Sequence, residues 1–409
     1  MLLNTLPERR SNLFNLLPDS TLAVLFAGDE CHRSADSLYR YTPNRNYYYL
    51  SGQREPRAVF MLLKTDSHNQ TYLFIERPEP RKIMYRGEMP DAGQARANSG
   101  VDIVYYIDQL DEIIGRIMLR ICPVNFYADC TRQTLNESMD LGSVFVHKMI
   151  KNYPHLVLKD LGTIIGNLRR IKTADEITCL RTASDATVSG MTELIKKIRP
   201  GAWTYELRAE FEYYLTRNNM ENSFLPVTTS GKDTLSLHYS KEAQLNDGDI
   251  VLVDLGAEYD CYGVDICRVY PVSGKFSDIQ RHWYEVVLEA ELELISHLKP
   301  GFDMKNIGPL GDKLLTGPLK QAGLITDNNE IRKYLDHGIY HFIGLDAHDA
   351  GESCVLKAGM ALTVEPGLYL KEFGFGIRVE DSILITELGN EVMTKNLLSS
   401  VNDIENFMK

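Results

Sequence analysis

Several features common in secreted, membrane and nucleic-acid-binding proteins are missing from this 409-residue sequence. Its seven cysteines are scattered, odd in number and without a C-x-x-C pair, which argues against a disulfide framework or zinc finger and suits a reducing compartment. No stretch of about 18 uncharged apolar residues occurs, so we expect no membrane span. The opening MLLNTLPERRSNLF reaches charged residues too soon for the apolar core of a signal peptide. Together these absences predict a cytoplasmic protein.

Positive charge is also in short supply, because 44 Lys and Arg face 56 Asp and Glu, a net charge of −12. This balance argues against nucleic acid or an anionic membrane as a partner. What the chain does contain is a hydrophobic fraction of 44%, which is ordinary for a globular protein with a core. Its length exceeds the roughly 100–200 residues of a typical domain, so we expect two domains.

The first predicted domain, residues 1–165, alternates short apolar runs with helical stretches. Strands are predicted for three runs rich in β-forming residues, and helices for two further segments: 21–28, 58–64 and 71–76, then 8–17 and 109–121. Such alternation predicts an α/β domain. The sequence Thr173-Ala-Asp-Glu176 then forms a capping box, which begins a helix and indicates a domain boundary nearby.

The second predicted domain, residues 174–409, has a different pattern. Helices are predicted at 174–198, 204–218, 277–297 and roughly 303–322. Strands are predicted in DIVLVDLGAEY, GVDICRVYPV, GMALTVEPGLYL and GIRVEDSILIT. This half is therefore predicted to be α+β, with helices packed against one mostly antiparallel sheet.

The first pair of these strands contains two aspartates. A hairpin with a two-residue turn at Tyr259-Asp260 would place Asp254 directly opposite Asp265. Like charges that face each other across a strand pair destabilise it, and Asp254 lies in the apolar run VLVDL, where an unpaired carboxylate is costly to bury. A metal ion is the natural compensating charge.

The second strand pair repeats this arrangement with two glutamates. A hairpin centred on Glu372-Phe373 would place Glu365 opposite Glu380, although the glycines that follow also allow a longer loop. A single acidic residue in a strand is more often structural than functional. Two such pairs in one domain favour a cluster of four carboxylates.

Three histidines lie within twelve residues of one another, in DHGIYHFIGLDAHDAG: His337, His341 and His348. His238 lies just upstream of the first hairpin and is a weaker candidate. Neutral imidazole joins carboxylates at Zn, Mn and Co sites, and two-metal hydrolases bridge their ions with carboxylates and a water. The pattern predicts a metal hydrolase and leaves the bond that it cleaves open.

These residues resemble a known family. From about 170 to 400 the chain is similar to the pita-bread metallopeptidases, whose ordered ligands are Asp, Asp, His, Glu and Glu, with the aspartates eleven residues apart and the fourth ligand in a T-V-E-P-G block. The segments H-x-x-G-L-D-x-H-D and V-E-P-G-L-Y resemble the proline-specific branch, and RSADSLYRYTPNRNYYYLSGQREP resembles the N-terminal domain of aminopeptidase P. The ligands that this resemblance implies are Asp254, Asp265, His341, Glu365 and Glu380.

The resemblance also implies catalytic roles. Glu365 would bind metal and act as the acid and base for a water that bridges two metal ions. His238 and His348 would contact the substrate and the developing oxyanion, a role that requires aimed donors. Arg378 would orient Glu380 or hold a hydrogen-bond network around the metals, and Tyr369 would help to form the substrate site.

The implied function is removal of the N-terminal residue from peptides that have proline second. Prolidase, which cleaves Xaa-Pro dipeptides, shares every ligand and stays an alternative, as does a non-catalytic binding module of the same fold. The resemblance favours two Mn²⁺ ions, with Co²⁺, Zn²⁺ and Fe²⁺ also compatible with these ligands. It further implies a homodimer or homotetramer.

Three positions depart from the pattern of the family. Cys267 replaces a threonine in D-I-T-R, which removes a hydroxyl and adds a thiol beside the predicted site. Asn46 lies where aminopeptidase P often has Asp, and Tyr85 lies where it has a tryptophan. Because Asn46 and Tyr85 depart from the family pattern, the preferred length of the substrate is left open.

Overall fold

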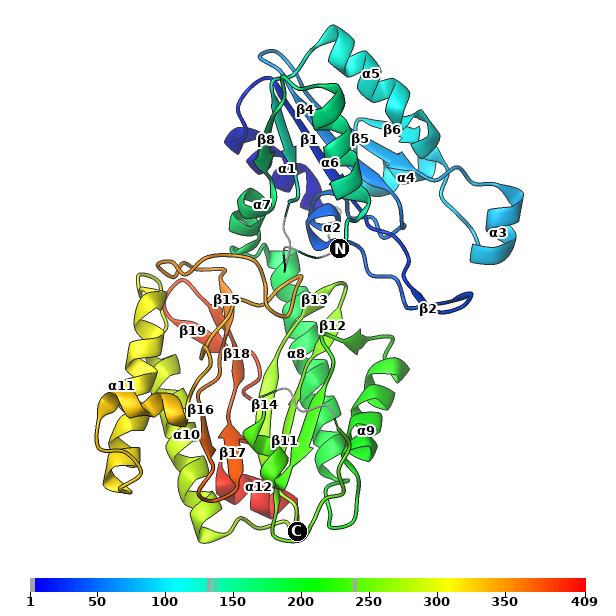
Figure 1. The fold of residues 1–409 in the computed structure, drawn as a ribbon. Helices are drawn as coiled ribbons and strands as arrows, with labels where there is room; N and C mark the ends of the chain where they lie inside the picture. The colour runs from blue at the N-terminus through cyan, green and yellow to red at the C-terminus, as the bar shows by residue number, and fades with distance from the viewer. Residues whose placement is uncertain (1–3, 131–133, 135, 137, 238–240) are drawn as a thin grey trace. The chain divides into compact units, whose positions relative to one another are not determined.

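The computed structural model describes residues 4–130, 134, 136, 138–237 and 241–409. The chain divides into two compact units, Met1–Arg169 and Arg170–Lys409 (Figure 1). Each unit has its own sheet structure and its own helices, so the two are described separately below.

The first unit is built on a six-stranded sheet with the order β6-β5-β4-β1-β7-β8. The central strands β1, β4 and β5 are antiparallel, whereas β6, β7 and β8 join in parallel. The three predicted strands are confirmed. The bounds are β1 (Thr21–Phe26), β4 (Val59–Lys64), β5 (Asn69–Ile75), β6 (Ile103–Tyr106), β7 (Asn125–Ala128) and β8 (Val157–Asp160), with a separate hairpin of β2 (His32–Ser34) and β3 (Ser37–Leu38).

Helices cover this sheet. Alternate side chains of the central strands, such as Leu22 and Val24, form a core with the apolar face of α5, where Ile113, Ile114 and Ile117 recur at helical spacing. The two predicted helices are confirmed as α1 and α5. The bounds are α1 (Leu6–Leu16), α2 (Arg45–Ser51), α3 (Pro80–Arg86), α4 (Ala92–Ser99), α5 (Leu110–Arg120), α6 (Leu141–Asn152) and α7 (Gly162–Arg169).

The second unit begins with the predicted capping box. The side chain of Thr173 accepts a hydrogen bond from the backbone N–H of Glu176, whose own side chain returns to the N–H of Thr173. In Figure 1 the strands of this unit lie between α8 and α9 on one side and α10 and α11 on the other. The bounds are α8 (Ala174–Ile195), α9 (Thr204–Arg217), α10 (Asp278–His297), α11 (Ile307–Gln321) and α12 (Val401–Phe407).

Strand pairing in the second unit is antiparallel, as predicted, but it is divided into short ladders rather than one continuous sheet. Pro366 lies between β15 and β16 and has no N–H to donate, which helps to interrupt the ladder there. The main strands are β10 (Val227–Ser230), β11 (Ile250–Leu255), β14 (Ile266–Pro271), β15 (Ala361–Val364), β16 (Gly367–Leu370), β17 (Phe375–Arg378), β18 (Asp381–Ile385) and β19 (Asn390–Val392). A bridge between Cys267 and Glu380 joins the two predicted hairpins.

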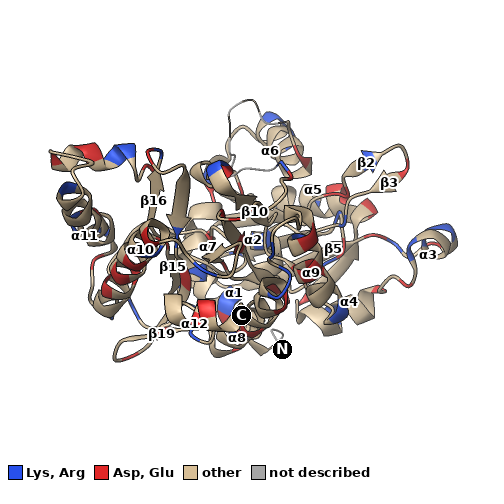
Figure 2. Cartoon of the chain, turned by 90° about the horizontal axis from the view of Figure 1, so that it is seen from below, with Lys and Arg blue, Asp and Glu red and all other residues tan. Residues whose placement is uncertain are grey.

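The helices differ in the charged residues that they carry. Acidic residues prevail on α10, whereas α11 carries both acidic and basic residues (Figure 2). Within the described part of the chain, no helix combines the length and the apolar character that crossing a bilayer requires.

Candidate metal centre

The first hairpin differs from its predicted register. Asp254 pairs with Cys267 and not with Asp265, because the turn lies at Asp260-Cys261 and not at Tyr259-Asp260. Both turn residues have positive φ, 52° for Asp260 and 69° for Cys261. Two-residue hairpin turns favour this left-handed backbone, which Asp tolerates and a bulky Tyr does not. The predicted pairing is therefore wrong by two residues.

The carboxylates nevertheless share one face of the hairpin, because a shift of two residues keeps every side chain on its side of the strand. Asp254 and Asp265 become diagonal neighbours, and each has an oxygen within 4.8 Å of the other and of an oxygen of Glu380. Gly256 makes this approach possible, since a Cβ there would lie 1.8 Å from the carbonyl oxygen of Val264.

The second hairpin has its predicted register. Gly367 pairs with Arg378 in β16 and β17, and Val364 pairs with Asp381 in β15 and β18. Glu365 and Glu380 therefore lie opposite each other in the hairpin register, between the ladder of β15 with β18 and the ladder of β16 with β17. Four residues, 371–374, form the loop, and Gly374 supplies the positive φ of 74° that the loop needs.

His341 brings its imidazole to three of these carboxylates. Its Nε2 lies 3.6 Å from Oδ2 of Asp265, 3.7 Å from Oε1 of Glu365 and 3.8 Å from Oε1 of Glu380. Its Nδ1 lies 3.0 Å from the carbonyl oxygen of Phe342. A proton on Nδ1 that is donated to this carbonyl leaves the Nε2 lone pair directed at the cluster, which is the form of imidazole that binds metals.

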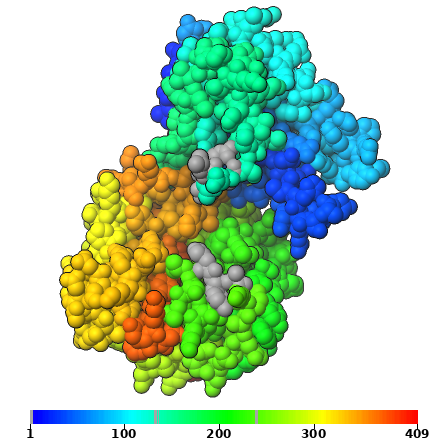
Figure 3. Space-filling model, in the orientation of Figure 1, coloured from blue at the N-terminus to red at the C-terminus, as the bar shows by residue number. Residues whose placement is uncertain are grey.

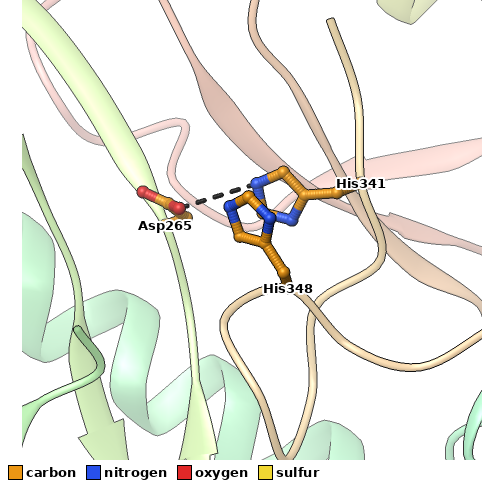
Figure 4. Close-up of side chains that lie close together, drawn as sticks. All are labelled: Asp265, His341 and His348. Carbon is orange, nitrogen blue, oxygen red and sulfur yellow. Dashed lines mark ion pairs between the residues drawn. The ribbon is translucent and has the colours of Figure 1, made fainter. Parts of the chain in front are cut away.

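The other predicted histidines lie around this centre. The ring of His348 stacks on the ring of His341 with centroids 3.9 Å apart, and Figure 4 shows both beside Asp265. His337 lies with Nδ1 3.8 Å from Oε2 of Glu365 and Nε2 3.3 Å from the hydroxyl of Tyr369. His238 lies outside the described residues.

Several carboxylate oxygens of the cluster are buried without a hydrogen-bond partner among the described residues: Oδ1 of Asp254, Oδ1 of Asp265 and Oε1 of Glu380. Burial, and after it the charge of Asp254, raises the pKa of Asp265. Burial followed by Asp265 raises the pKa of Glu380, and burial raises the pKa of Glu365 to about 8. Burial and the neighbouring His348 lower the pKa of His341 to about 4. Paired acidic groups beside a neutral imidazole suit divalent cations.

Arg378 contacts Asp254 rather than Glu380. Two roles were predicted for it, orienting Glu380 or holding a hydrogen-bond network around the metals, and these contacts match the second. Its guanidinium donates to Oδ2 of Asp254, and its Nη1 donates to the hydroxyl of Tyr369 at 2.8 Å. Tyr369 is buried and does not line the cavity at the site; it connects Arg378 to His337.

Two further residues at the centre were not found from the sequence. Arg268 donates to the carbonyl oxygen of Glu380 at 2.6 Å and to both carboxylate oxygens of Asp381 at 2.9 and 2.8 Å. Both side chains are buried, and together they tie β14 to the start of β18 next to Glu380. Their sequence signal is weak: Arg268 is a charged residue inside the apolar strand β14, and Asp381 is the first residue of β18.

A cavity of about 560 Å³ opens over the cluster. Its polar wall comprises the carboxylates, the three described histidines and Arg378, and its apolar wall includes Phe224, Leu225, Val227 and Leu237. The segment 337–348 is orange in Figure 3. It meets green segments from the first half of this unit on the face shown. A polar floor and an apolar wall suit a small ligand that has both polar and apolar parts.

The departures from the family pattern fall in both units. Cys267 is buried and lies opposite Asp254 in the ladder. In the first unit, Asn46 donates to Asp129 at 2.8 Å and accepts from Arg169 at 2.8 Å. Tyr85, on α3, has 74% of its surface exposed, so it is not part of the core of its unit.

Comparison with known proteins agrees with this geometry. Residues 178–387 match the model of metallopeptidase family M24, and residues 6–121 match the N-terminal domain of aminopeptidase P. The Xaa-Pro aminopeptidase of Escherichia coli is 32% identical over 98% of this chain and 96% of its own length. Human Xaa-Pro aminopeptidase 3 is 29% identical over 95% of this chain and 80% of its own length.

Solved structures share the whole fold. A Bacillus anthracis structure assigned to aminopeptidase P has a TM-score of 0.96 at 35% identity and covers 100% of this chain and 98% of its own. Escherichia coli aminopeptidase P with the inhibitor Pro-Leu has a TM-score of 0.90 at 30% identity and covers 99% of this chain and 98% of its own. From its sequence match, its two-domain architecture and its cluster of carboxylates and histidine, the chain belongs to metallopeptidase family M24.

Proposed function

We propose that this protein is a metal-dependent Xaa-Pro aminopeptidase, which releases the N-terminal residue from peptides with proline in the second position. The observation that carries the proposal is the buried cluster of four carboxylates and His341, in which three carboxylate oxygens have no hydrogen-bond partner among the described residues. Relatives named Xaa-Pro aminopeptidase that match nearly the whole chain support the choice of substrate.

Two divalent ions would be held by Asp254, Asp265, His341, Glu365 and Glu380. The orphaned oxygens and the raised pKa values of the buried carboxylates fit cations, since carboxylate and imidazole ligands together suit Mn, Co, Zn or Fe. Such an ion pair, when bound, lowers the pKa of a water and polarises the scissile carbonyl. We propose Mn²⁺ as the preferred ion; the Escherichia coli aminopeptidase P has also been solved in a zinc-substituted form.

The surrounding side chains provide proton transfer and binding. Glu365 would accept and return a proton of the attacking water, since its carboxylate faces the cavity beside His341 and His337. His348, at the rim beside His341, would donate to the carbonyl oxygen as negative charge develops on it, and His238 would act with it. Arg378 and Tyr369 would hold Asp254 and His337 in place through their hydrogen bonds.

The shape of the site can explain a preference for proline in the second position of the substrate. An Xaa-Pro bond has no N–H, and the ring fixes φ near −65°, so recognition depends on shape rather than on a hydrogen bond to that nitrogen. The apolar wall that includes Phe224, Leu225 and Leu237 offers such a surface. We also propose a cytoplasmic homo-oligomer, in keeping with the composition and the family.

The test compares an Xaa-Pro-Xaa tripeptide with the matching Xaa-Pro dipeptide, side by side with Mn²⁺. We expect turnover of the tripeptide, with Glu365→Ala inactive as the matched control. Hydrolysis confined to the dipeptide would instead indicate prolidase. Less than about one equivalent of metal after reconstitution, with Glu365→Ala as active as the wild type, would overturn the peptidase proposal in favour of a binding module.

A further inference from the structure

The segment 341–349 carries one histidine of the centre at each end and contains neither helix nor strand. Its first end is fixed to β15: the N–H of Thr363 donates to the carbonyl oxygen of His341 at 2.8 Å, and the N–H of Ile343 donates to that of Ala361 at 3.1 Å. These sheet-like bonds hold His341 independently of His348 at the other end.

The second end is held by a buried ion pair. Nζ of Lys172 lies 2.9 Å from Oδ2 of Asp349, the residue directly after His348, and both side chains are only 1% exposed. The other oxygen of Asp349 accepts from the N–H of Ala350 at 2.9 Å, and the N–H of Asp349 donates to the carbonyl oxygen of Phe342 at 2.8 Å. Lys172 therefore anchors this end of the segment from a distant part of the chain.

The lysine is itself rigidly placed. Its backbone N–H donates to the carbonyl oxygen of Gly359 at 2.8 Å, and the residue after it begins α8 through the capping box. The segment also packs closely around the ion pair: a Cβ on Gly344 would lie 2.1 Å from Oδ2 of Asp349 and 3.0 Å from Cε of Lys172. The ion pair thus fills the inside of the segment, and only glycine fits at position 344.

We propose that Lys172, through Asp349, is a positioning residue that holds His348 over the metal centre; this inference rests on the proposed function of His348. Asp349 directly follows His348, so a displacement of Asp349 would move the His348 ring from its stacked position on His341, where the ring centroids lie 3.9 Å apart. A Lys172 variant without the charge removes this buried ion pair, and a buried carboxylate that loses an ion pair is favoured to move toward water. His341 keeps its own bonds to β15, so metal binding is unaffected.

Lys172→Met tests this in the full chain reconstituted with Mn²⁺. We expect kcat on an Xaa-Pro-Xaa tripeptide to fall by about tenfold or more, with two bound Mn²⁺ and an affinity within about threefold of wild type. Amide exchange in 343–350 should become faster, while exchange in 361–364 stays unchanged. Arg181→Met is the matched control, because it removes the exposed ion pair with Glu391 from α8, the helix that follows Lys172, and should change none of these quantities.

The double variant Lys172→Met/Asp349→Leu removes both charges and leaves none buried alone, so it keeps the test available where the single variant does not fold. It should show the same loss of kcat with metal retained. Full kcat in a folded variant, or kcat and bound metal lost in equal proportion, would overturn the inference. The exchange measurement needs no activity: an inactive wild type contradicts the proposed function, whereas unchanged exchange in 343–350 contradicts the positioning role.

Discussion

Replacing Glu365 by Gln should change how the stability of the metal-free protein depends on pH. In the folded state the pKa of Glu365 is raised from 4.5 to about 8 by burial. A folded-state pKa above the unfolded one means that the folded state binds this proton more tightly. The stability that the proton contributes is complete below the unfolded pKa and is lost as the pH rises through about 8.

The size of the effect follows from the same shift. One pKa unit corresponds to about 1.4 kcal/mol, and integrating the linkage from about pH 5 to about pH 8 gives a loss of roughly 3 kcal/mol for this one group. His341, whose pKa is lowered to about 4, has the opposite dependence, with stability lost as the pH falls below its unfolded pKa. The charge of Glu365 also raises the pKa values of Asp265 and Glu380, so the difference between the two proteins reports Glu365 together with its effect on these two neighbours.

The assay is urea unfolding of both proteins in the presence of a chelator, followed by tryptophan fluorescence. Both tryptophans, Trp203 and Trp283, lie in the second unit, which contains the site. We expect the free energy of unfolding of the wild type to fall relative to that of the variant by roughly 3 kcal/mol across this range. Parallel pH profiles would refute the argument that burial keeps Glu365 protonated.

Three further outcomes follow from the geometry. Mn²⁺ should raise the melting temperature of the wild type more at pH 8 than at pH 5 in thermal unfolding, since protons compete for the carboxylates; an equal gain at both contradicts this. Asp265→Ala should lower kcat on a tripeptide by at least about 100-fold and reduce bound metal, measured by mass spectrometry, with an unchanged circular dichroism spectrum; retained metal would count against Asp265 as a ligand. Gly256→Ala should destabilise the protein by about 3 kcal/mol or more in urea, because its Cβ would lie 1.8 Å from a carbonyl oxygen, whereas Gly115→Ala in α5, where an added Cβ meets no described atom within 4 Å outside its own stretch of helix, should be neutral or stabilising. Equal effects of the two glycine variants would contradict the close approach at Gly256.

Local pattern predicted much of the fold and the acidic half of the site. Period-two alternation and turn residues identified both hairpins, and the second register is confirmed by the pairing of β16 with β17, with Gly374 at positive φ in the loop. The first register is wrong by two residues because two adjacent turns were compatible with the sequence, and only the left-handed backbone of Asp260 and Cys261 distinguishes them. The aspartates nevertheless share a face, since strand faces repeat every two residues.

Contacts between distant parts of the chain could not be predicted in this way. The ion pair of Lys172 and Asp349 joins residues 177 positions apart, and that of Arg268 and Asp381 joins residues 113 apart. No periodicity links such positions, so their partners follow only from the tertiary fold. The choice of His341 over His337 and His348 depended on family resemblance, and the distances from its Nε2 to three carboxylates now support it independently.

The central claim is that Asp254, Asp265, His341, Glu365 and Glu380 hold two divalent ions. Anomalous scattering from crystals of the protein grown with Mn²⁺ tests it most directly. We predict two peaks within coordination distance of these five side chains and weaker peaks in Asp265→Ala crystals. A single peak, or strong peaks that none of the five side chains contacts, would contradict the assignment.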